Sequence, residues 1–288
     1  IGQTDTGETG INDVIIEDVT FLTDEQGNSY PPGSIDPEGI ALSPRKTVFI
    51  SSEGDPSQDI APFIGEFDLE TGQKQLNIPI PNRYLPDTAE KDKGVRNNLA
   101  FESLTVNPTG LVDVDPFRLF TATESATIQD DVEKADVNAR IRLMHYGINP
   151  IGRPILIAEH LYLLDPASID IISNGLTELL ALKEEGNFLS LERTFGFTGA
   201  GAKIFQVVVG NATDISNVSS LKEDITQIRP LKKQLLLDLN ELGIYLDNLE
   251  GMTFGPRLAD GSRSLILVSD NNFNEEQITQ FLLFKIAK

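Results

Sequence analysis

The sequence contains no cysteine and no tryptophan, and it has only two histidines, His145 and His160. The lack of cysteine excludes disulfides and thiolate metal sites, and two isolated histidines exclude chemistry that needs a histidine cluster. No run approaches the ~20 apolar residues of a membrane span. Basic residues are also scarce, because 23 stand against 44 acidic residues and leave a net charge of −21. Nucleic acid and anionic membranes are therefore disfavoured as partners, since clustered Lys and Arg bind phosphate.

The acidic excess favours cations, cationic ligands or solubility in a salty medium. The chain begins at Ile1 and continues with the polar stretch GQTDTGETG, which is typical of a mature N-terminus after removal of a targeting segment. We therefore expect an exported protein. Its 288 residues fit either one large domain or two ordinary ones. We expect a flexible segment at 1–12, a single domain at 13–288, and a monomer.

Short apolar or alternating runs dominate the chain, among them TVFISSE, LFTATES, FLSLER and SLILVSD. Bounded by Gly, Pro, Asn and Asp, such runs indicate β-strands. Helical periodicity is scarce, and the best candidates for short helices are 240–246 and 274–278. The pattern predicts an all-β sandwich, barrel or propeller.

An internal repeat decides among these folds. A glutamate followed by alternating apolar residues recurs in DPEGIAL, LAFESLTV, GLTELLAL and DNLEGMTFG, at separations of 64, 76 and 72 residues. A second apolar run that ends in an acid follows each time, then a third strand, and in the first three units a fourth. The glutamates are Glu38, Glu102, Glu178 and Glu250, and the closing acids are Glu53, Glu124, Glu192 and Asp270.

This repeat predicts a β-propeller of four-stranded antiparallel blades, with four units visible and a fifth or sixth left open. The last unit lacks a fourth strand, and the run DVIIEDVTFL at 13–22 is expected to supply it and close the ring. A stacked sandwich is the runner-up, but it would not explain why an acid recurs at two fixed places.

The recurring acids are expected to meet at one mouth of the channel, because the first two strands of each blade join near one face. Taken singly, each acid either satisfies backbone N–H groups or belongs to a site. As a set, converging carboxylates repel unless they are protonated, paired or metal-bound. Two arginines near the motifs, Arg96 and Arg193, either pair with acids or hold an anionic group of a ligand.

The remaining acids suit a hard cation such as Ca²⁺, which takes about six to eight oxygen ligands. The candidate metal ligands are Glu102, Glu124, Glu192, Glu250, Asp270 and Asn271. The candidate catalytic residues are Glu38, Glu53, Arg96 and Arg193.

The stretches DPEGIAL, FISSEGD, RNNLAFESLTV, FLSLERTFG, DNLEGMTFGP and SLILVSDNNF, in this order over 15–287, resemble the phytase-like domain family. That family is also described as having esterase-like activity of phytase. The resemblance implies a bacterial, exported β-propeller, periplasmic or extracellular, that hydrolyses phosphate or other esters. It also implies a calcium-lined acidic channel, as in the related propeller phytases. It implies that the acids and arginines above, with Asn98 and Asn271, occupy the family's acidic and polar positions. The third unit departs from the pattern, because Leu179 stands where the others have Gly39, Ser103 or Gly251.

The leading hypothesis is a calcium-dependent hydrolase of a small-molecule phosphate ester or other ester, with Glu38 or Glu53 as general base or further ligand. A covalent mechanism is not supported, because the sequence has no G-x-S-x-G motif and no cysteine to provide a nucleophile. The alternative is a non-catalytic exported binding protein whose acidic channel holds a cation or small ligand. A third is a scaffold whose acids only satisfy backbone groups.

Overall fold

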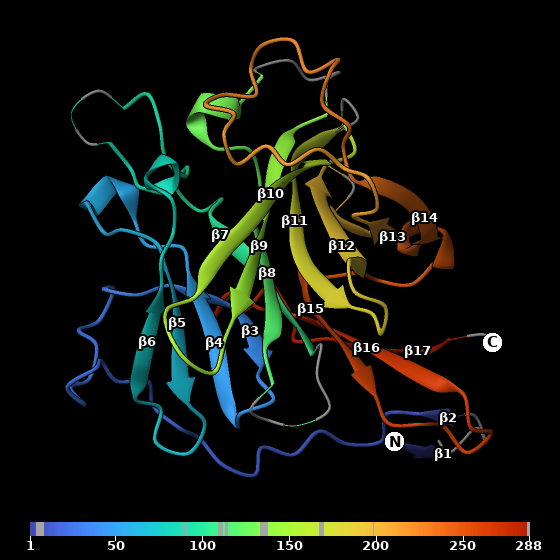
Figure 1. Ribbon diagram of the computed structural model, residues 1–288. Helices are drawn as coiled ribbons and strands as arrows, with labels where there is room; N and C mark the ends of the chain where they lie inside the picture. The colour runs from blue at the N-terminus through green and yellow to red at the C-terminus, as the bar shows by residue number, and fades with distance from the viewer. Residues whose placement is uncertain are drawn as a thin grey trace.

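The computed structural model describes residues 1–3, 9–87, 89, 91–108, 112, 115–132, 138–166, 170–197 and 199–286. These residues form four antiparallel blades, each built from consecutive strands and arranged around a common centre, and one separate two-stranded sheet (Figure 1). The predicted all-β propeller with four repeats is therefore confirmed.

Blades 1 to 3 have four strands each, and blade 4 has three among the described residues. Blade 1 consists of β3 (Pro37–Leu42), β4 (Thr47–Ser52), β5 (Phe63–Asp68) and β6 (Lys74–Ile78). Blade 2 consists of β7 (Phe101–Pro108), β8 (Phe117–Thr123), β9 (Arg140–Ile148) and β10 (Ile155–Leu163). Blade 3 consists of β11 (Ile171–Ala181), β12 (Asn187–Gly196), β13 (Gly199–Val208) and β14 (Lys232–Asp238). Blade 4 consists of β15 (Leu249–Gly255), β16 (Arg263–Ser269) and β17 (Phe281–Ile286).

The blades pack face to face through apolar side chains, and the innermost strands lie side by side in the order β3, β7, β11, β15. One apolar cluster lies between each consecutive pair of blades. Strand β4 is buried at every position, because Phe49 packs toward blade 2, while Val48 and Ile50 pack with Phe67 and with Leu22 from the segment before blade 1. The centres of the three clusters are Phe49, Phe101 and Leu104, then Phe120, Leu179 and Phe188, then Leu191, Met252 and Leu267.

The expected closing strand at 13–22 does not form. Residues 11–22 have no regular secondary structure, and the large apolar side chains between 14 and 21 are exposed. The C-terminal end of this segment is instead drawn to blade 1, because Thr23 exchanges backbone hydrogen bonds with Gly72 and Lys74. Leu22 packs on the same blade. The segment therefore leaves the free edge of β17 without a fourth strand.

The remaining elements are short. Strands β1 (Gly2–Gln3) and β2 (Thr9–Gly10) pair with each other. Four 3₁₀ turns occur among the described residues: η1 (Pro56–Gln58), η2 (Asn82–Tyr84), η3 (Ile128–Asp130) and η4 (Leu239–Leu242). Of the two expected short helices, the one near 240–246 corresponds in part to the 3₁₀ turn η4, and residues 274–278 form no helix. In the described part of the chain, no helix has the length and apolar character needed to cross a membrane.

A buried ion-pair network ties the long β13–β14 loop, which arches over β10 to β12 in Figure 1, to blade 2. The Arg142 side chain in β9 is fully buried and donates to both carboxylate oxygens of Asp130, at 2.6 and 3.1 Å. It also donates to Glu159 in β10 at 3.2 Å and to the loop carbonyl of Val218 at 2.9 Å. The Asp130 carboxylate in turn accepts the backbone N–H of Leu221. Every arm of this guanidinium is therefore used to hold the fold.

His145 gives the fold a specific sensitivity to acid. Burial, and then the charge of Arg118, lower the pKa of this imidazole from 6.5 to about 4. Its ring stacks on Phe120 with centroids 4.4 Å apart, and its buried Nε2 has no partner among the described residues. The unfolded chain therefore binds a proton more readily than the folded one between pH 6.5 and 4. Folding stability is lost as the pH falls through that window and is fully retained above it.

We expect His145→Phe, which keeps the stack on Phe120, to remove this acid sensitivity. Relative to its value at pH 8, the free energy of unfolding at pH 4 should fall by roughly 1–2 kcal/mol less in the variant than in the parent. Urea unfolding of both proteins between pH 8 and 4 measures the difference. Parallel pH profiles would show that His145 has an ordinary pKa.

A candidate acidic site at one mouth of the propeller

A β-bulge recurs in the inner strand of every blade and sets the direction of the acidic side chains. In each pair of first and second strands, two residues of the inner strand oppose one residue of its neighbour. A bulge re-aims the side chain of the extra residue away from the regular alternation of the sheet. The extra residues are Glu38, Glu102, Thr177 and Glu250.

The third blade therefore places its glutamate one residue later than the repeat suggested. Thr177 occupies the bulge, and Glu178 takes the position that Gly39, Ser103 and Gly251 hold elsewhere. The Glu178 carboxylate accepts the backbone N–H groups of Leu179 at 2.8 Å and Leu104 at 3.4 Å. Burial raises the pKa of Glu178 to about 8. Superposing Glu178 on the other three glutamates was wrong, and its contacts serve the packing of the inner strands.

Arg193 in β12 joins acids from the blades on either side of it. Its guanidinium lies 2.8 Å from Glu124 of blade 2 and 3.2 Å from Glu250 of blade 4. It also donates to the side chain of Asn248, which in turn donates to Glu250 at 2.7 Å. Glu124 can approach so closely because Gly175 faces it, and a Cβ at that position would collide with the carboxylate. These contacts place Arg193 at the centre of an acidic cluster.

Glu102, from the bulge of blade 2, is the member of this cluster with an unpartnered oxygen. Its side chain is buried, and its Oε2 has no hydrogen-bond partner in the described structure. Burial, and next the charge of Glu124, raise the pKa of Glu102, while the charge of Arg193 opposes the rise. A buried carboxylate oxygen without a partner is costly, so this atom indicates a missing ligand or proton.

Three further acids gather at the rim formed by blade 1. One carboxylate oxygen from each of Asp36, Glu38 and Glu53 lies within 4.8 Å of the others, an arrangement that can hold a metal ion. Glu53 accepts the backbone N–H of Ala100. Burial, together with the charges of Glu124, Asp36 and Glu250, raises the pKa of Glu53 to about 7 although this hydrogen bond opposes the shift. Sequence analysis missed Asp36, because it occurs only in DPEG and has no counterpart in the other repeats.

Asp270 completes the cluster on the side of blade 4. It follows β16, and its charge contributes to the raised pKa values of Glu38 and Glu250. Burial is the first cause of the rise for Glu250, whose pKa is about 7. We call the following residues the acidic cluster: Asp36, Glu38, Glu53, Glu102, Glu124, Glu250 and Asp270, with Arg193 as their counter-charge.

Three residues proposed from the sequence lie apart from these contacts. Glu192 pairs with Lys233 at 2.5 Å and accepts the Tyr162 hydroxyl at 2.5 Å. Arg96 pairs with Asp131 at 3.0 Å and donates to Ser125 and to a backbone carbonyl. Asn271 uses its side-chain oxygen to accept the N–H of Phe273 within its own turn. Of the ten candidate metal ligands and catalytic residues named from the sequence, seven therefore lie in the acidic cluster, together with Asp36.

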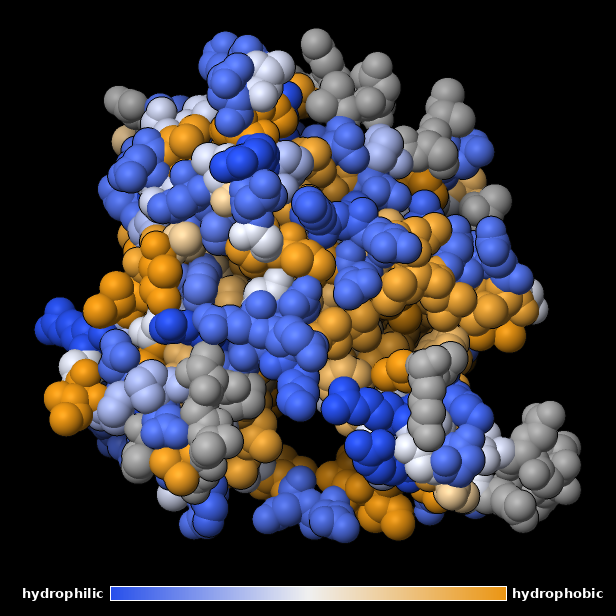
Figure 2. All heavy atoms as spheres, turned by 45° about the vertical axis from the view of Figure 1, so that its right-hand side comes forward, coloured by the Kyte–Doolittle hydropathy of each residue, from blue (hydrophilic) through white to orange (hydrophobic). Residues whose placement is uncertain are grey.

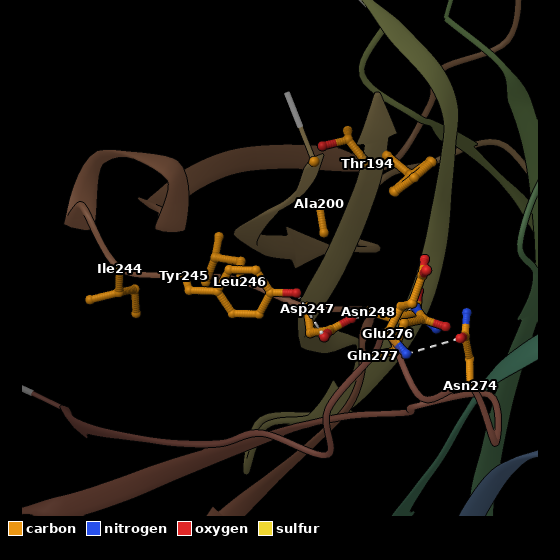
Figure 3. Close-up of a pocket in the computed structure, with 12 residues that line it drawn as sticks. Thr194, Ala200, Ile244, Tyr245, Leu246, Asp247, Asn248, Asn274, Glu276 and Gln277 are labelled. Atoms are coloured by element: carbon orange, nitrogen blue, oxygen red, sulfur yellow. Dashed lines mark hydrogen bonds between the residues drawn. The ribbon is translucent and has the colours of Figure 1, made fainter. Parts of the chain in front are cut away.

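A pocket of about 510 Å³ is lined by Asn248, whose side chain contacts Arg193 and Glu250 of the acidic cluster (Figure 3). Its lining combines the rings of Phe195 and Tyr245 with amide and carboxylate side chains from two irregular segments. The Tyr245 hydroxyl donates to Asp247 at 3.0 Å, and both rings are largely exposed. Tyr245 and Glu276 lie outside the repeat motifs, which explains why sequence analysis did not find the pocket, although Asn248 and Phe195 lie within DNLEGMTFG and FLSLERTFG. The other lining residues include Thr194, Ala200, Ile244, Leu246, Asn274, Glu276 and Gln277.

The residues present fit a hard cation. The donors are carboxylate oxygens throughout, which Ca²⁺ prefers, and the orphaned Oε2 of Glu102 lies among them. Arg193 contacts two of the seven acids, so most of the negative charge lacks a contacting cation among the described side chains. Calcium would be held by Asp36, Glu38 and Glu53 or by Glu102 and its neighbours.

Comparison with known proteins agrees with the resemblance seen in the motifs. The model of a family described as "Phytase-like: Esterase-like activity of phytase" matches residues 2–273. No curated protein matches the chain. Among solved structures, an α-L-arabinanase of Penicillium chrysogenum in complex with arabinobiose is similar, with 10% sequence identity and a TM-score of 0.39. That match covers 89% of this chain and 64% of the arabinanase chain, so the present chain spans under two thirds of its length.

Proposed function

The chain belongs to the phytase-like family, and from this premise we propose that it is a calcium-dependent hydrolase of phosphate or other esters that acts at the acidic cluster. Family membership and the propeller fold support a hydrolase-type function. One observation carries the finer proposal. Glu102 presents a buried, unpartnered carboxylate oxygen amid six other acids, an arrangement that a bound cation would stabilise.

In the proposed reaction, the cation and the side chains have separate roles. Calcium, when bound, polarises an ester oxygen and lowers the pKa of water nearby. We assign Glu53 and Glu102 to holding the cation, and Arg193 to positioning Glu124 and Glu250. Glu38, at the solvent-exposed rim, is placed to accept the proton of the attacking water once the charge of the bound cation has lowered its raised pKa of about 8. The ester then breaks to an acid and an alcohol.

The pocket beside Asn248 is the proposed place for the organic part of the ester. It continues directly from Glu250 through the Asn248 side chain. Exposed rings and amides bind neutral organic surfaces, whereas the acidic lining of Asp247 and Glu276 disfavours a second anionic group. We also propose that the protein acts outside the cytoplasm, in the periplasm or medium, where calcium sites of modest affinity are filled.

Calcium is expected to raise the Tm of the protein. At a calcium concentration about 100 times Kd, the rise should be roughly 5–10 °C, because binding to the folded state alone contributes about 2.7 kcal/mol. Differential scanning calorimetry with CaCl₂ and with excess chelator measures the rise. Glu102→Gln should abolish most of it, whereas Glu178→Gln, a buried glutamate outside the acidic cluster, should leave it intact.

The same measurement separates the two hypotheses that the sequence left open. A Tm that is indifferent to calcium would overturn the metal-dependent proposal. Stabilisation by calcium without turnover of any ester would favour the non-catalytic binding protein.

A further inference from the structure

At one position of the innermost strand, the side chain is buried in blades 2, 3 and 4 but exposed in blade 1. The second residue after the bulge is Leu104 in blade 2, Leu179 in blade 3 and Met252 in blade 4. Each is at most 5% exposed, because it packs against the preceding blade. The equivalent residue of blade 1 is Ile40, and it is 62% exposed. Blade 1 therefore lacks the preceding neighbour that the other blades have.

Blade 4 lacks a following neighbour in the same way. In blades 1 to 3, the second-strand residues Phe49, Phe120 and Leu189 are buried beneath the next blade. Their equivalent in blade 4 is Ile266, which is only partly buried, as is Val268 on the same face. The contact that would close a four-bladed ring is thus incomplete on both sides.

The two uncovered faces, together with the inner strands β7 and β11, line a hollow of about 560 Å³, which we call the wedge. Ile40, Leu42 and Val48 form its side on blade 1. Ile266, Val268 and Phe281 form its side on blade 4. Figure 2 shows an open gap in the lower part of the molecule, bordered by both apolar and polar residues. Apolar sheet faces left open in this way are typical of an interaction surface.

We infer that the wedge receives a fifth antiparallel β-sheet, of which residues 13–22 are the outermost strand. In blades 1 to 3 the outermost strand leads through a loop into the innermost strand of the next blade, as β6 leads to β7, β10 to β11 and β14 to β15. Residues 13–22 stand in the same relation to β3. The inference is independent of the proposed hydrolase activity.

The character and position of this segment support the assignment. Its run VIIEDVTFL has the composition of a strand, yet Ile15 and Ile16 are 73% and 81% exposed. At its end, Leu22 packs with Val48, Ile50 and Phe67 on the wedge side of blade 1. The strands inside it would come from polypeptide outside residues 1–288, because the described residues before 13 hold only the two-residue strands β1 and β2.

The natural absence of cysteine allows a direct test by single-cysteine labelling. Ile40→Cys reports on the wedge, Leu104→Cys on the equivalent covered position, and Ile151→Cys on a surface site that is 88% exposed in the parent chain. Reaction with a maleimide is timed in the 288-residue chain and in the natural translation product that contains it. In the 288-residue chain, Ile40→Cys should react as fast as Ile151→Cys. In the natural product its reaction should be about 100-fold slower, while that of Ile151→Cys stays unchanged.

Two results would overturn the inference. Fast reaction of Ile40→Cys in the natural product would show that the wedge stays open to solvent. Slow reaction already in the 288-residue chain would show that the wedge closes by itself or against a second copy, which sedimentation distinguishes. Leu42→Cys, on the same side of the wedge and 64% exposed in the parent, repeats the test should Ile40→Cys fail to fold.

Discussion

The double substitution Glu53→Gln plus Glu102→Gln is expected to lower calcium-dependent ester hydrolysis about 10³-fold or more. Both side chains are buried in the acidic cluster, and they are two of its seven carboxyl groups. Glutamine keeps their shape, and the amide oxygen at position 53 can still accept the N–H of Ala100. The loss therefore falls on cation binding and on charge stabilisation in the transition state, which are worth several kcal/mol. Initial rates with p-nitrophenyl phosphate and p-nitrophenyl acetate at saturating calcium measure it.

Glu178→Gln is the matched control for this substitution. Its carboxyl is also buried, and its raised pKa of about 8 keeps it largely protonated at neutral pH, so the amide is a close substitute. We expect rates within about threefold of the parent, because its contacts are the backbone groups of Leu104 and Leu179. Equal activity of the double variant and the parent would place the reaction elsewhere on the protein. A loss in Glu178→Gln as large as in the double variant would mean that packing, and not charge, controls the rates.

The repeat predicted the fold well because a propeller is built from local units. Each blade consists of consecutive strands, so the order of apolar runs and acids along the chain is also the order in space. The acid at the start of the first strand of a blade and the acid at the end of its second strand lie at the same mouth of the propeller, because these two strands are antiparallel neighbours. Position along a strand is a local property, and a sequence displays it directly.

The membership of the acidic cluster was harder to predict because bulges and partners are not local. A shift of one residue in the β11–β12 register puts Thr177 in the bulge and turns Glu178 into the packing of the inner strands. Glu192 stands at the predicted end of its strand, but Lys233 from β14 and Tyr162 from β10 take its carboxylate. Neither partner is near Glu192 in sequence, and no repeat marks them.

The segment 13–22 illustrates a further limit of the sequence pattern. Its composition is that of a strand, but no strand forms there, because a strand needs a partner edge and composition does not say where that edge is. The free edge of β17 offered one candidate, whereas the hydrogen bonds of Thr23 hold the segment beside blade 1. The uncovered faces of the wedge became visible only when equivalent positions of the blades were compared.

Arg142→Met is expected to destabilise the folded protein by about 3–5 kcal/mol, the largest effect on stability that we predict. The change leaves the carboxylates of Asp130 and Glu159 buried with their main counter-charge removed, and uncompensated buried charge is costly. The contacts that fix the β13–β14 loop to blade 2, including the hydrogen bond to Val218, are lost at the same time. Urea unfolding measures the free energy, and hydrogen exchange of the amides at 215–221 reports on the loop.

Two further variants show whether buried charge is the cause. Arg96→Met removes a comparable ion pair with Asp131 that is part-exposed, and it should cost less than about 1 kcal/mol because solvent screens such pairs. Adding Asp130→Asn and Glu159→Gln to Arg142→Met neutralises the two stranded carboxylates and should restore part of the lost stability. No recovery in that triple variant would assign the loss to packing of the Arg142 side chain. Equal effects of Arg142→Met and Arg96→Met would show that burial does not strengthen the network, because the two pairs differ chiefly in their exposure to water.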